Sequence, residues 1–145
     1  MMSSPSNSSE PRVEFSETIT STRDAIDRVL ETCLEGLLQC RHDETAVFAI
    51  RLAMVESVAN AMNDGNGGDS SKTILVEFEV APGRFRAVVE DQGPGFNPET
   101  VPDPTAEENL TIASGRGLAL MKAFMTEVVV VPPGNRLELM YTNEN

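Results

Sequence analysis

The sequence predicts an α+β fold, a two-layer sandwich with helices on one face of a mainly antiparallel, mixed sheet. Apolar residues recur at helical spacing in two long segments near the N-terminus, and they alternate with polar residues around two Pro-Gly turns. The expected order is β-α-α-β-β-lid-α-β-β, which gathers the helices into one layer. We expect residues 1–11 to be a disordered Ser/Pro-rich tail and residues 12–145 to form a single domain.

The first strand and helix have clear local signals. Residues 13–19 alternate and predict a strand. Ser21 or Thr22 is a suitable N-cap for a helix that runs to about Arg41. Its apolar stripe consists of Ile26, Val29, Leu30, Cys33, Leu37 and Cys40.

A second helix is expected to begin near Asp43, whose carboxylate suits an N-cap, and to continue to about Met62. Residues 63–71 are rich in Gly, Asn, Asp and Ser, which predicts a flexible end to this helix. The apolar stripe of the helix includes Val47, Ile50, Met54 and Val58.

The second half of the chain predicts two hairpins and a short helix. Residues 72–80 and 84–91 alternate around Pro82-Gly83, and residues 127–131 and 137–142 do so around Pro133-Gly134. Residues 117–126 are expected to form a helix. Residues 97–114 lack periodicity and are long for a connection, which favours a functional lid.

Composition narrows the function classes. The chain has 145 residues and a formal net charge of −12, which argues against direct binding to nucleic acid or to an anionic membrane surface. Neither of its two lysines, Lys72 and Lys122, follows a glycine, so a Walker phosphate loop is absent. Because no stretch has the pattern of a signal peptide or a membrane span, we expect a cytoplasmic protein.

Cysteine and histidine chemistry is not favoured. Cys33 and Cys40 lie in one predicted helix, separated by about 10 Å of rise, which is too far for a disulfide. We therefore expect two buried free thiols. The single histidine, His42, and the lack of a Cys-x-x-Cys pair exclude the usual zinc sites. His42 lies in a polar junction, where we expect a solvated side chain.

Three clusters carry the candidate chemistry, and the first lies on the second helix. Glu56, Asn60 and Asn63 are four and three residues apart. An α-helix would place them on one face, within about 60° of one another. They are either a solvated face or a carboxylate with amide oxygens that faces a metal-bound ligand, because hard cations such as Mg²⁺ prefer oxygen donors.

The second and third clusters contain paired glycines. In residues 90–96 a strand ends at Asp91, followed by Gly93 and Gly95. This pattern is typical of a tight turn. It also fits a site where the backbone approaches a flat ligand and the carboxylate accepts a hydrogen bond from an exocyclic amine of that ligand. In residues 114–120 glycines open a helix, where free amides form a phosphate cradle or simply let the chain pass close to the sheet.

Together, the order and spacing of the clusters resemble the N, G1 and G2 boxes of the GHKL (HATPase_c) ATPase/kinase superfamily. The matching motifs are Glu56-x-x-x-Asn60-Ala61, Asp91-x-Gly93-x-Gly95 and Gly115-x-Gly117-Leu118. The resemblance covers about residues 13–142 and implies the Bergerat ATP-binding fold. The short lid, and the absence of an upstream phospho-acceptor helix, make the chain most similar to anti-sigma-factor serine/threonine kinases.

The resemblance implies a role for individual residues. Asn60 would hold Mg²⁺ that bridges the ATP phosphates, Asp91 would bind the adenine amino group, and the turn at 115–118 would hold the phosphates. Glu56 matches the position proposed to act as base toward the substrate hydroxyl. The implied cofactor-binding set is Asn60, Asn63, Asp91, Gly93, Gly95, Phe96, Ser114, Gly115, Arg116, Gly117 and Leu118.

The function implied is that of a Mg-ATP-dependent anti-sigma regulatory factor. It would phosphorylate a Ser or Thr of a STAS-type anti-anti-sigma protein and sequester a sigma factor, and homodimerisation follows by analogy. Asn63-Asp64 stands where the family often has a residue followed by His, Asn135 where many members have Thr, and Ala113 where some have Arg. These departures motivate an alternative, a nucleotide-sensing binding module with little or no kinase activity.

Overall fold

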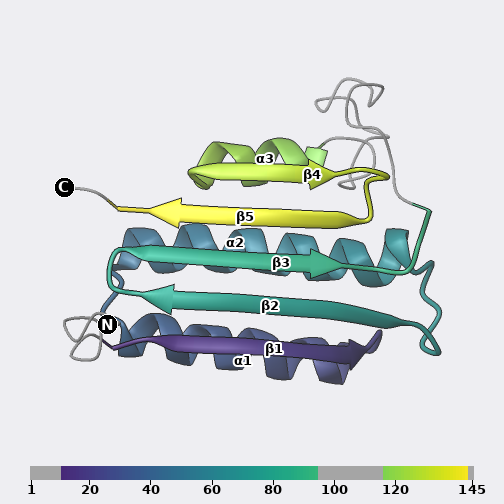
Figure 1. Ribbon diagram of the computed structural model, residues 1–145, viewed down its shortest axis with the longest axis horizontal. Coiled ribbons are helices and arrows are strands. Elements are labelled where there is room, and N and C mark those ends of the chain that lie inside the picture. The colour runs from purple at the N-terminus through teal and green to yellow at the C-terminus, as the bar shows by residue number, and fades with distance from the viewer. Residues whose placement is uncertain (1–10, 95–115, 144–145) are drawn as a thin grey trace, which may run out of the picture.

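A single five-stranded sheet organises the molecule, covered on one face by helices (Figure 1). The computed structural model describes residues 11–94 and 116–143. Its strand order is β1-β2-β3-β5-β4, comprising β1 (Val13–Thr20), β2 (Thr73–Ala81), β3 (Arg84–Glu90), β5 (Arg136–Thr142) and β4 (Glu127–Val131). The α+β sandwich is confirmed. Every strand pairing in the described part of the chain is antiparallel, so this sheet is not mixed.

The helices begin where their caps predict. They are α1 (Arg23–Gln39), α2 (Glu44–Asn60), its π-helical continuation η2 (Ala61–Gly65), and α3 (Arg116–Phe124). Thr22 accepts a hydrogen bond from the Ala25 amide at 3.3 Å, and Asp43 accepts one from the Ala46 amide at 2.8 Å. These bonds satisfy amides that have no intrahelical partner, which fixes both helix starts.

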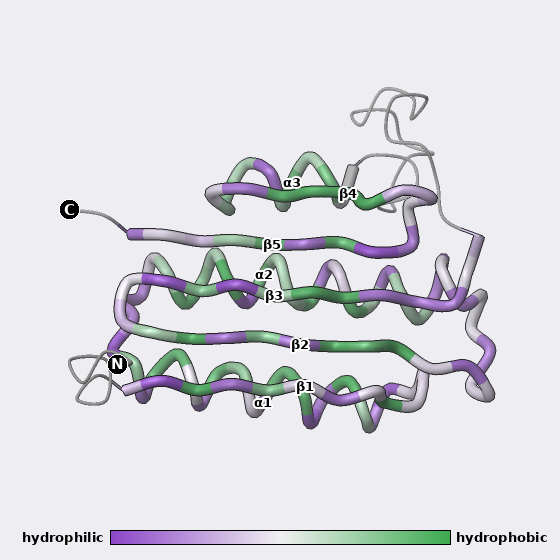
Figure 2. The backbone as a smooth tube through the Cα atoms, viewed as in Figure 1, coloured by the Kyte–Doolittle hydropathy of each residue, from purple (hydrophilic) through white to green (hydrophobic). Residues whose placement is uncertain are grey.

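The core lies between the helices and one face of the sheet. Along β2 the side chains of Ile74, Val76, Phe78 and Val80 are buried, and the residues between them are half-buried. Hydropathy alternates along the strands of the sheet (Figure 2). The predicted stripes of α1 and α2 pack onto this face, with Leu37, Ile50, Met54 and Val58 fully buried. Cys33 and Cys40 are buried free thiols, as expected.

His42 departs from its prediction. Its side chain is buried rather than solvated, and its Nε2 lies 2.9 Å from the carbonyl oxygen of Ala81. The junction between α1 and α2 packs over the end of β2, so a residue that is polar in sequence contacts the core. His42 thereby ties the α1–α2 junction to the β2–β3 turn, a structural role that local sequence does not reveal.

The central helix is apolar on most of its surface. Among the described residues, the stretch Glu44–Gly65 is the one long and apolar enough to span a membrane, by length and composition alone. Ala53, Met54 and Val58 of this stretch lie in the core, and α2 contacts both β3 and β5. Part of its apolar surface is thus that of a core helix, whereas Phe48 and Val55 are exposed.

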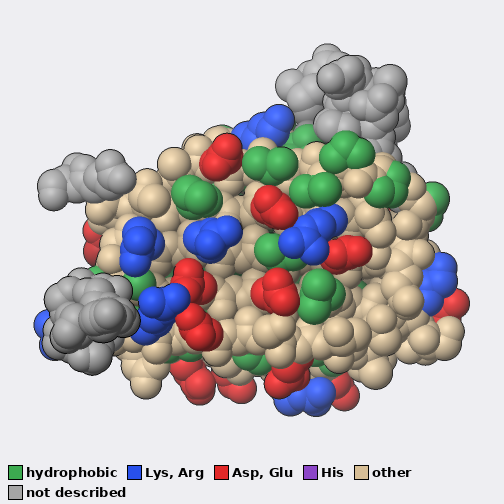
Figure 3. All heavy atoms as spheres, viewed as in Figure 1, with side chains coloured by type: hydrophobic (Ala, Val, Ile, Leu, Met, Phe, Trp, Pro, Cys, Tyr) green, Lys and Arg blue, Asp and Glu red, His purple; other side chains and the backbone are tan. Residues whose placement is uncertain are grey.

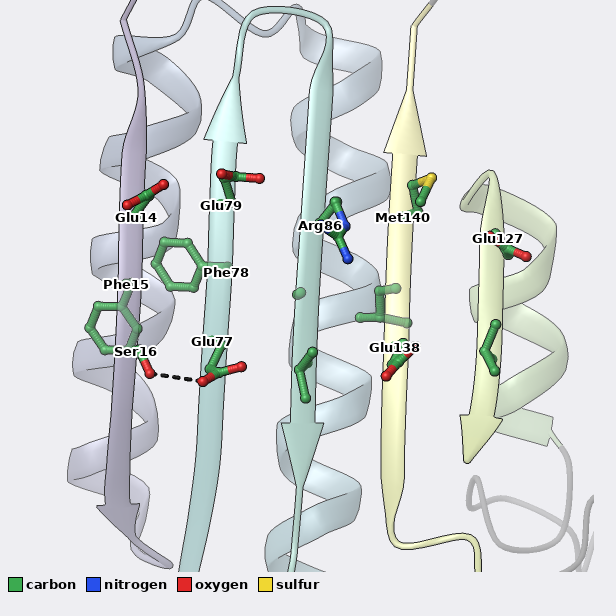
Figure 4. Close-up of a pocket in the computed structure, with 14 residues that line it drawn as sticks. Glu14, Phe15, Ser16, Glu77, Phe78, Glu79, Arg86, Glu127, Glu138 and Met140 are labelled. Carbon is green, nitrogen blue, oxygen red and sulfur yellow. Dashed lines mark hydrogen bonds between the residues drawn. The ribbon is translucent and has the colours of Figure 1, made fainter. Parts of the chain in front are cut away.

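No helix among the described residues covers the opposite face of the sheet, which carries interspersed acidic, basic and apolar side chains (Figure 3). A hollow of about 320 Å³ lies on it (Figure 4). There Ser16 donates a hydrogen bond to Glu77 at 2.9 Å, and Arg86 projects from β3. Of the predicted site residues that the structure describes, none lines this hollow.

Candidate functional site

Two of the predicted site residues, Asp91 and Gly93, lie where the α2–η2 helix ends beside the end of β3. Asp91 directly follows β3, and Gly65 is the last residue of η2. A Cβ added to Gly65 would lie 2.1 Å from Asp91 Oδ2, and one added to Gly93 would lie 2.0 Å from the carbonyl oxygen of Gly65. Two backbone segments, the end of η2 and residues 91–93, therefore meet here with no room for a side chain at either glycine.

Asp91 is held firmly although it carries a buried carboxylate. The residue is 8% exposed. Burial raises the pKa of its carboxyl group, and the hydrogen bond from the Gly93 amide to Oδ1, at 2.7 Å, partly opposes that rise. A buried carboxylate with one protein donor has acceptor capacity left for a ligand N–H group.

Asn135 fixes the backbone of Asp91 from the neighbouring hairpin. Its carbonyl oxygen accepts from the Asp91 amide, and its side-chain Nδ2 donates to the Asp91 carbonyl oxygen, both at 2.9 Å. The residue that departs from the family pattern in sequence thus supports Asp91 through the main chain. The side-chain carboxylate is left for other contacts.

Glu56 and Asn60 lie one α-helical turn apart near the end of α2, as the spacing predicts. The Oδ1 atom of Asn60 is buried and has no hydrogen-bond partner among residues 11–94 and 116–143. A buried, unpaired amide oxygen is costly, so Asn60 Oδ1 is a candidate ligand atom within the described part of the chain.

The helix that carries Asn60 changes its geometry before it reaches Asn63, so the shared face of Asn63 stays a prediction. The chain changes from α- to π-helical hydrogen bonding at Ala61, so the α-helical angle from Asn60 no longer applies. The side chain of Asn63 is exposed. Helical periodicity alone gives no sign of this wider turn.

Sequence reasoning missed Gly65 and Asn66. Asn66 is 1% exposed, and its side chain accepts from the Gln92 amide at 2.8 Å and donates to the Thr73 carbonyl at 3.0 Å. The segment predicted as a flexible end to the helix is therefore anchored in the sheet. Its Gly/Asn composition indicated a turn, but one partner of Asn66, Gln92, lies 26 residues away beyond the end of β3.

The remaining predicted site residues are described only in part. Gly95, Phe96, Ser114 and Gly115 lie outside the described residues, as do the predicted lid and tail. Arg116 begins α3, confirming a helix start close to the predicted position. Gly117 and Leu118 are buried in the first turn of that helix.

The side-chain atoms available as ligands indicate which kind of metal ion this region could bind. Within the described residues no group of three or more His, Cys, Asp or Glu side chains could hold a metal ion. A cation here would have few protein ligands, with oxygen atoms such as Asn60 Oδ1 foremost. Mg²⁺ binds in this way, because it keeps several waters and is often shared with phosphates.

Comparison with known proteins identifies the family. A model of the histidine kinase-like ATPase domain matches residues 16–141. The chain belongs to the histidine kinase-like ATPase domain family. Membership confirms the resemblance drawn from the three motifs and implies an ATP-binding domain.

Relatives of this ATPase domain include anti-sigma factors. The anti-sigma F factor of Clostridium perfringens strain SM101 is 32% identical over 90 residues, covering 60% of this chain and 64% of the relative. That of strain ATCC 13124 is 33% identical over 84 residues, covering 56% and 59%. The chain therefore spans less than two thirds of the length of these relatives.

A solved structure shares the fold of this ATPase domain. The RsbU and RsbW domains of Rv1364c from Mycobacterium tuberculosis superpose with a TM-score of 0.61 at 23% identity. The match covers 91% of this chain and 32% of the other. At this identity the comparison establishes the fold.

Proposed function

We propose that this chain is a Mg-ATP-binding anti-sigma regulatory factor. It phosphorylates a Ser or Thr of a STAS-type anti-anti-sigma protein and sequesters a sigma factor. The observation that carries the proposal is the unpaired, buried Oδ1 of Asn60, one helical turn from Glu56. The anti-sigma F factors among its relatives support the regulatory part.

Two described residues bind different parts of Mg-ATP: Asp91 binds the adenine and Asn60 the magnesium ion. Asp91, buried at the end of β3, accepts a hydrogen bond from the adenine amino group, and Gly65 and Gly93 keep the space beside it free of side chains. Asn60 holds Mg²⁺, which neutralises charge on the phosphates. Asn63, Gly95, Phe96 and the turn at 114–118, Arg116 included, complete the proposed nucleotide site.

Glu56 is the proposed base. It lies on the same helix as Asn60, half-buried, so a hydroxyl brought to the terminal phosphate would meet a carboxylate able to take its proton. Positioning and electrostatics supply most of the acceleration in phosphoryl transfer, so the expected contribution of this base is a fraction of the total.

The wider setting of the protein is part of the same proposal. Residues 12–145 act as one ATP-binding domain, with a lid at about 97–114 and an N-terminal tail at 1–11. The partners are proteins, with no direct contact to nucleic acid or membrane, because the net charge of −12 repels polyanions. We place the protein in the cytoplasm, as a homodimer.

Transfer of labelled phosphate tests the activity. Wild-type protein incubated with γ-labelled ATP, Mg²⁺ and a cognate antagonist domain should label that domain. Glu56→Ala should lower the rate by about 10²–10⁴-fold, the usual contribution of a general base, and leave the ATP Kd unchanged. Glu35→Ala, which removes an exposed carboxylate from α1, is the matched control. A Glu56→Ala variant as fast as wild type would refute the assignment.

One departure from the family pattern favours the alternative, a nucleotide-sensing switch with little or no kinase activity. Asp64 occupies the position where the family often has His, on a π-helical turn that leaves neighbouring Asn63 exposed. This module would change its affinity for a partner with ATP and transfer no label. Partner binding measured with ATP and with a non-hydrolysable analogue separates the two, because the switch responds equally to both.

A further inference from the structure

At the end of the β2–β3 ladder, side-chain hydrogen bonds replace backbone hydrogen bonds between the strands. The register pairs Leu75 with Glu90, so a continued ladder would set Thr73 opposite Gln92. Both main-chain groups of Thr73 instead bond to side chains. Its amide donates to Gln92 Oε1 at 2.8 Å, and its carbonyl accepts from Asn66 Nδ2 at 3.0 Å.

The carboxamide of Asn66 stands between the two strand ends. It accepts a hydrogen bond from the Gln92 amide at 2.8 Å and donates one to the Thr73 carbonyl. One planar side-chain amide therefore replaces a direct backbone hydrogen bond between the two segments. Asn66 is 1% exposed, and both functional atoms of its side chain are bonded. An amide inserted into a ladder holds the strands farther apart than a backbone bond does.

The same residue is tied to the helix that carries Asn60. The Asn66 amide donates to the Ala61 carbonyl at 2.8 Å, which closes the π-helical turn. Asn66 therefore links the end of α2–η2 to β2 and to the segment just after Asp91. Where that segment leaves the sheet, Gly93 comes against the carbonyl of Gly65, and the Gly93 amide bonds to the Asp91 carboxylate.

We infer that Asn66 is a positioning residue that sets the Asp91 carboxylate relative to Asn60 and so determines selectivity for the 6-amino group of adenine. The inference rests on the proposed function, because it assigns Asp91 to that amino group. Asn66 itself touches no nucleotide. It acts by fixing the separation of the two strands and the path of residues 91–93.

Nucleotide selectivity tests this inference, because a ratio of two Kd values does not change with the fraction of protein that is folded. The probes are ATP and purine riboside triphosphate, which lacks the 6-amino group, each titrated into the full chain. Asn66→Asp keeps the shape and the bond from Gln92 but replaces the donor facing the Thr73 carbonyl. Ser71→Ala, whose lost hydroxyl bonds only to Asp69, is the matched control in the same segment.

Wild type and Ser71→Ala should both prefer ATP by about tenfold or more, the value of one hydrogen bond to a charged group. Asn66→Asp should bring the ratio close to one and change affinity for the analogue by less than about threefold. Gln92→Ala changes an exposed side chain and removes the hydrogen bond from the Thr73 amide, one of the three that join Asn66, Thr73 and Gln92. It should lower the preference for ATP by about threefold. This variant provides a second test if Asn66→Asp fails to fold.

The outcomes distinguish failure of the positioning role of Asn66 from failure of the adenine-binding role of Asp91. If wild type prefers ATP and Asp91→Asn removes the preference, while folded Asn66→Asp and Gln92→Ala retain it, the positioning role is refuted and the proposed function stands. If wild type binds both nucleotides equally, or neither, the adenine role of Asp91 fails and the inference fails with it.

Discussion

Replacing Gly65 by alanine should weaken nucleotide binding, because the added Cβ displaces the Asp91 carboxylate. The added Cβ would lie 2.1 Å from Asp91 Oδ2 and 2.2 Å from its Cγ. Because carbon atoms pack at about 3.5–4.0 Å, the carboxylate must retreat by at least about 1 Å. That movement breaks or lengthens its 2.7 Å bond from the Gly93 amide.

The size of the effect follows from the displacement. A misplacement of about 1 Å in a preorganised site costs on the order of 10²-fold. We therefore expect the ATP Kd of Gly65→Ala to rise by about 10–100-fold, measured by isothermal titration calorimetry at fixed Mg²⁺. Loss of the Gly93 bond should lower the free energy of unfolding by about 1.5–3 kcal/mol, measured by urea denaturation.

Gly67 provides the matched control. It lies two residues away with φ of 64° and has no neighbour within 4 Å of an added Cβ. Gly67→Ala should cost about 1 kcal/mol of stability through backbone strain and leave the ATP Kd unchanged. An unchanged Kd in Gly65→Ala, or an equal loss in both variants, would show that Asp91 does not depend on the bare backbone of Gly65.

Two further predictions concern buried titratable groups. Asp91→Asn should weaken ATP binding by about tenfold or more, to the affinity for the analogue that lacks the 6-amino group. The variant should be at least as stable as wild type at pH 7, because burial raises the pKa of this carboxyl group and a neutral amide keeps an acceptor for the Gly93 amide. A large loss of stability in urea denaturation would contradict this. Burial raises the pKa of the Cys33 thiol from 9.0 to about 12, so its contribution to stability is complete below pH 9 and is lost as pH rises toward 12. Urea denaturation between pH 8 and pH 11 should show a steeper decline for wild type than for Cys33→Ala, and parallel declines would refute the assignment.

Much of the fold could be predicted because its signals are local. Thr22 and Asp43 cap the two long helices, and alternation around Gly83 and Gly134 marks the two hairpins. These features depend on residues only a few positions apart. Asp91 could likewise be singled out, since an acid followed by spaced glycines is readable from the sequence alone.

The rest depends on contacts between distant segments. The Asn66 side chain bonds to Thr73 and Gln92, and His42 is buried against Ala81, 39 residues away. No periodicity predicts such pairings. The π-helical turn at Ala61 is a further example, because its bonds are set by where Asn66 is anchored. A sequence motif identifies candidate residues, whereas the orientation of their side chains depends on tertiary packing.

The central claim is that the unpaired Oδ1 of Asn60 and the buried carboxylate of Asp91 belong to one Mg-ATP site. Its most direct test is calorimetric titration of ATP into the wild-type chain with Mg²⁺ and with EDTA. The account predicts saturable binding at one site per chain, weakened at least about tenfold when Mg²⁺ is removed. Absence of ATP binding, or an affinity indifferent to Mg²⁺, would contradict it.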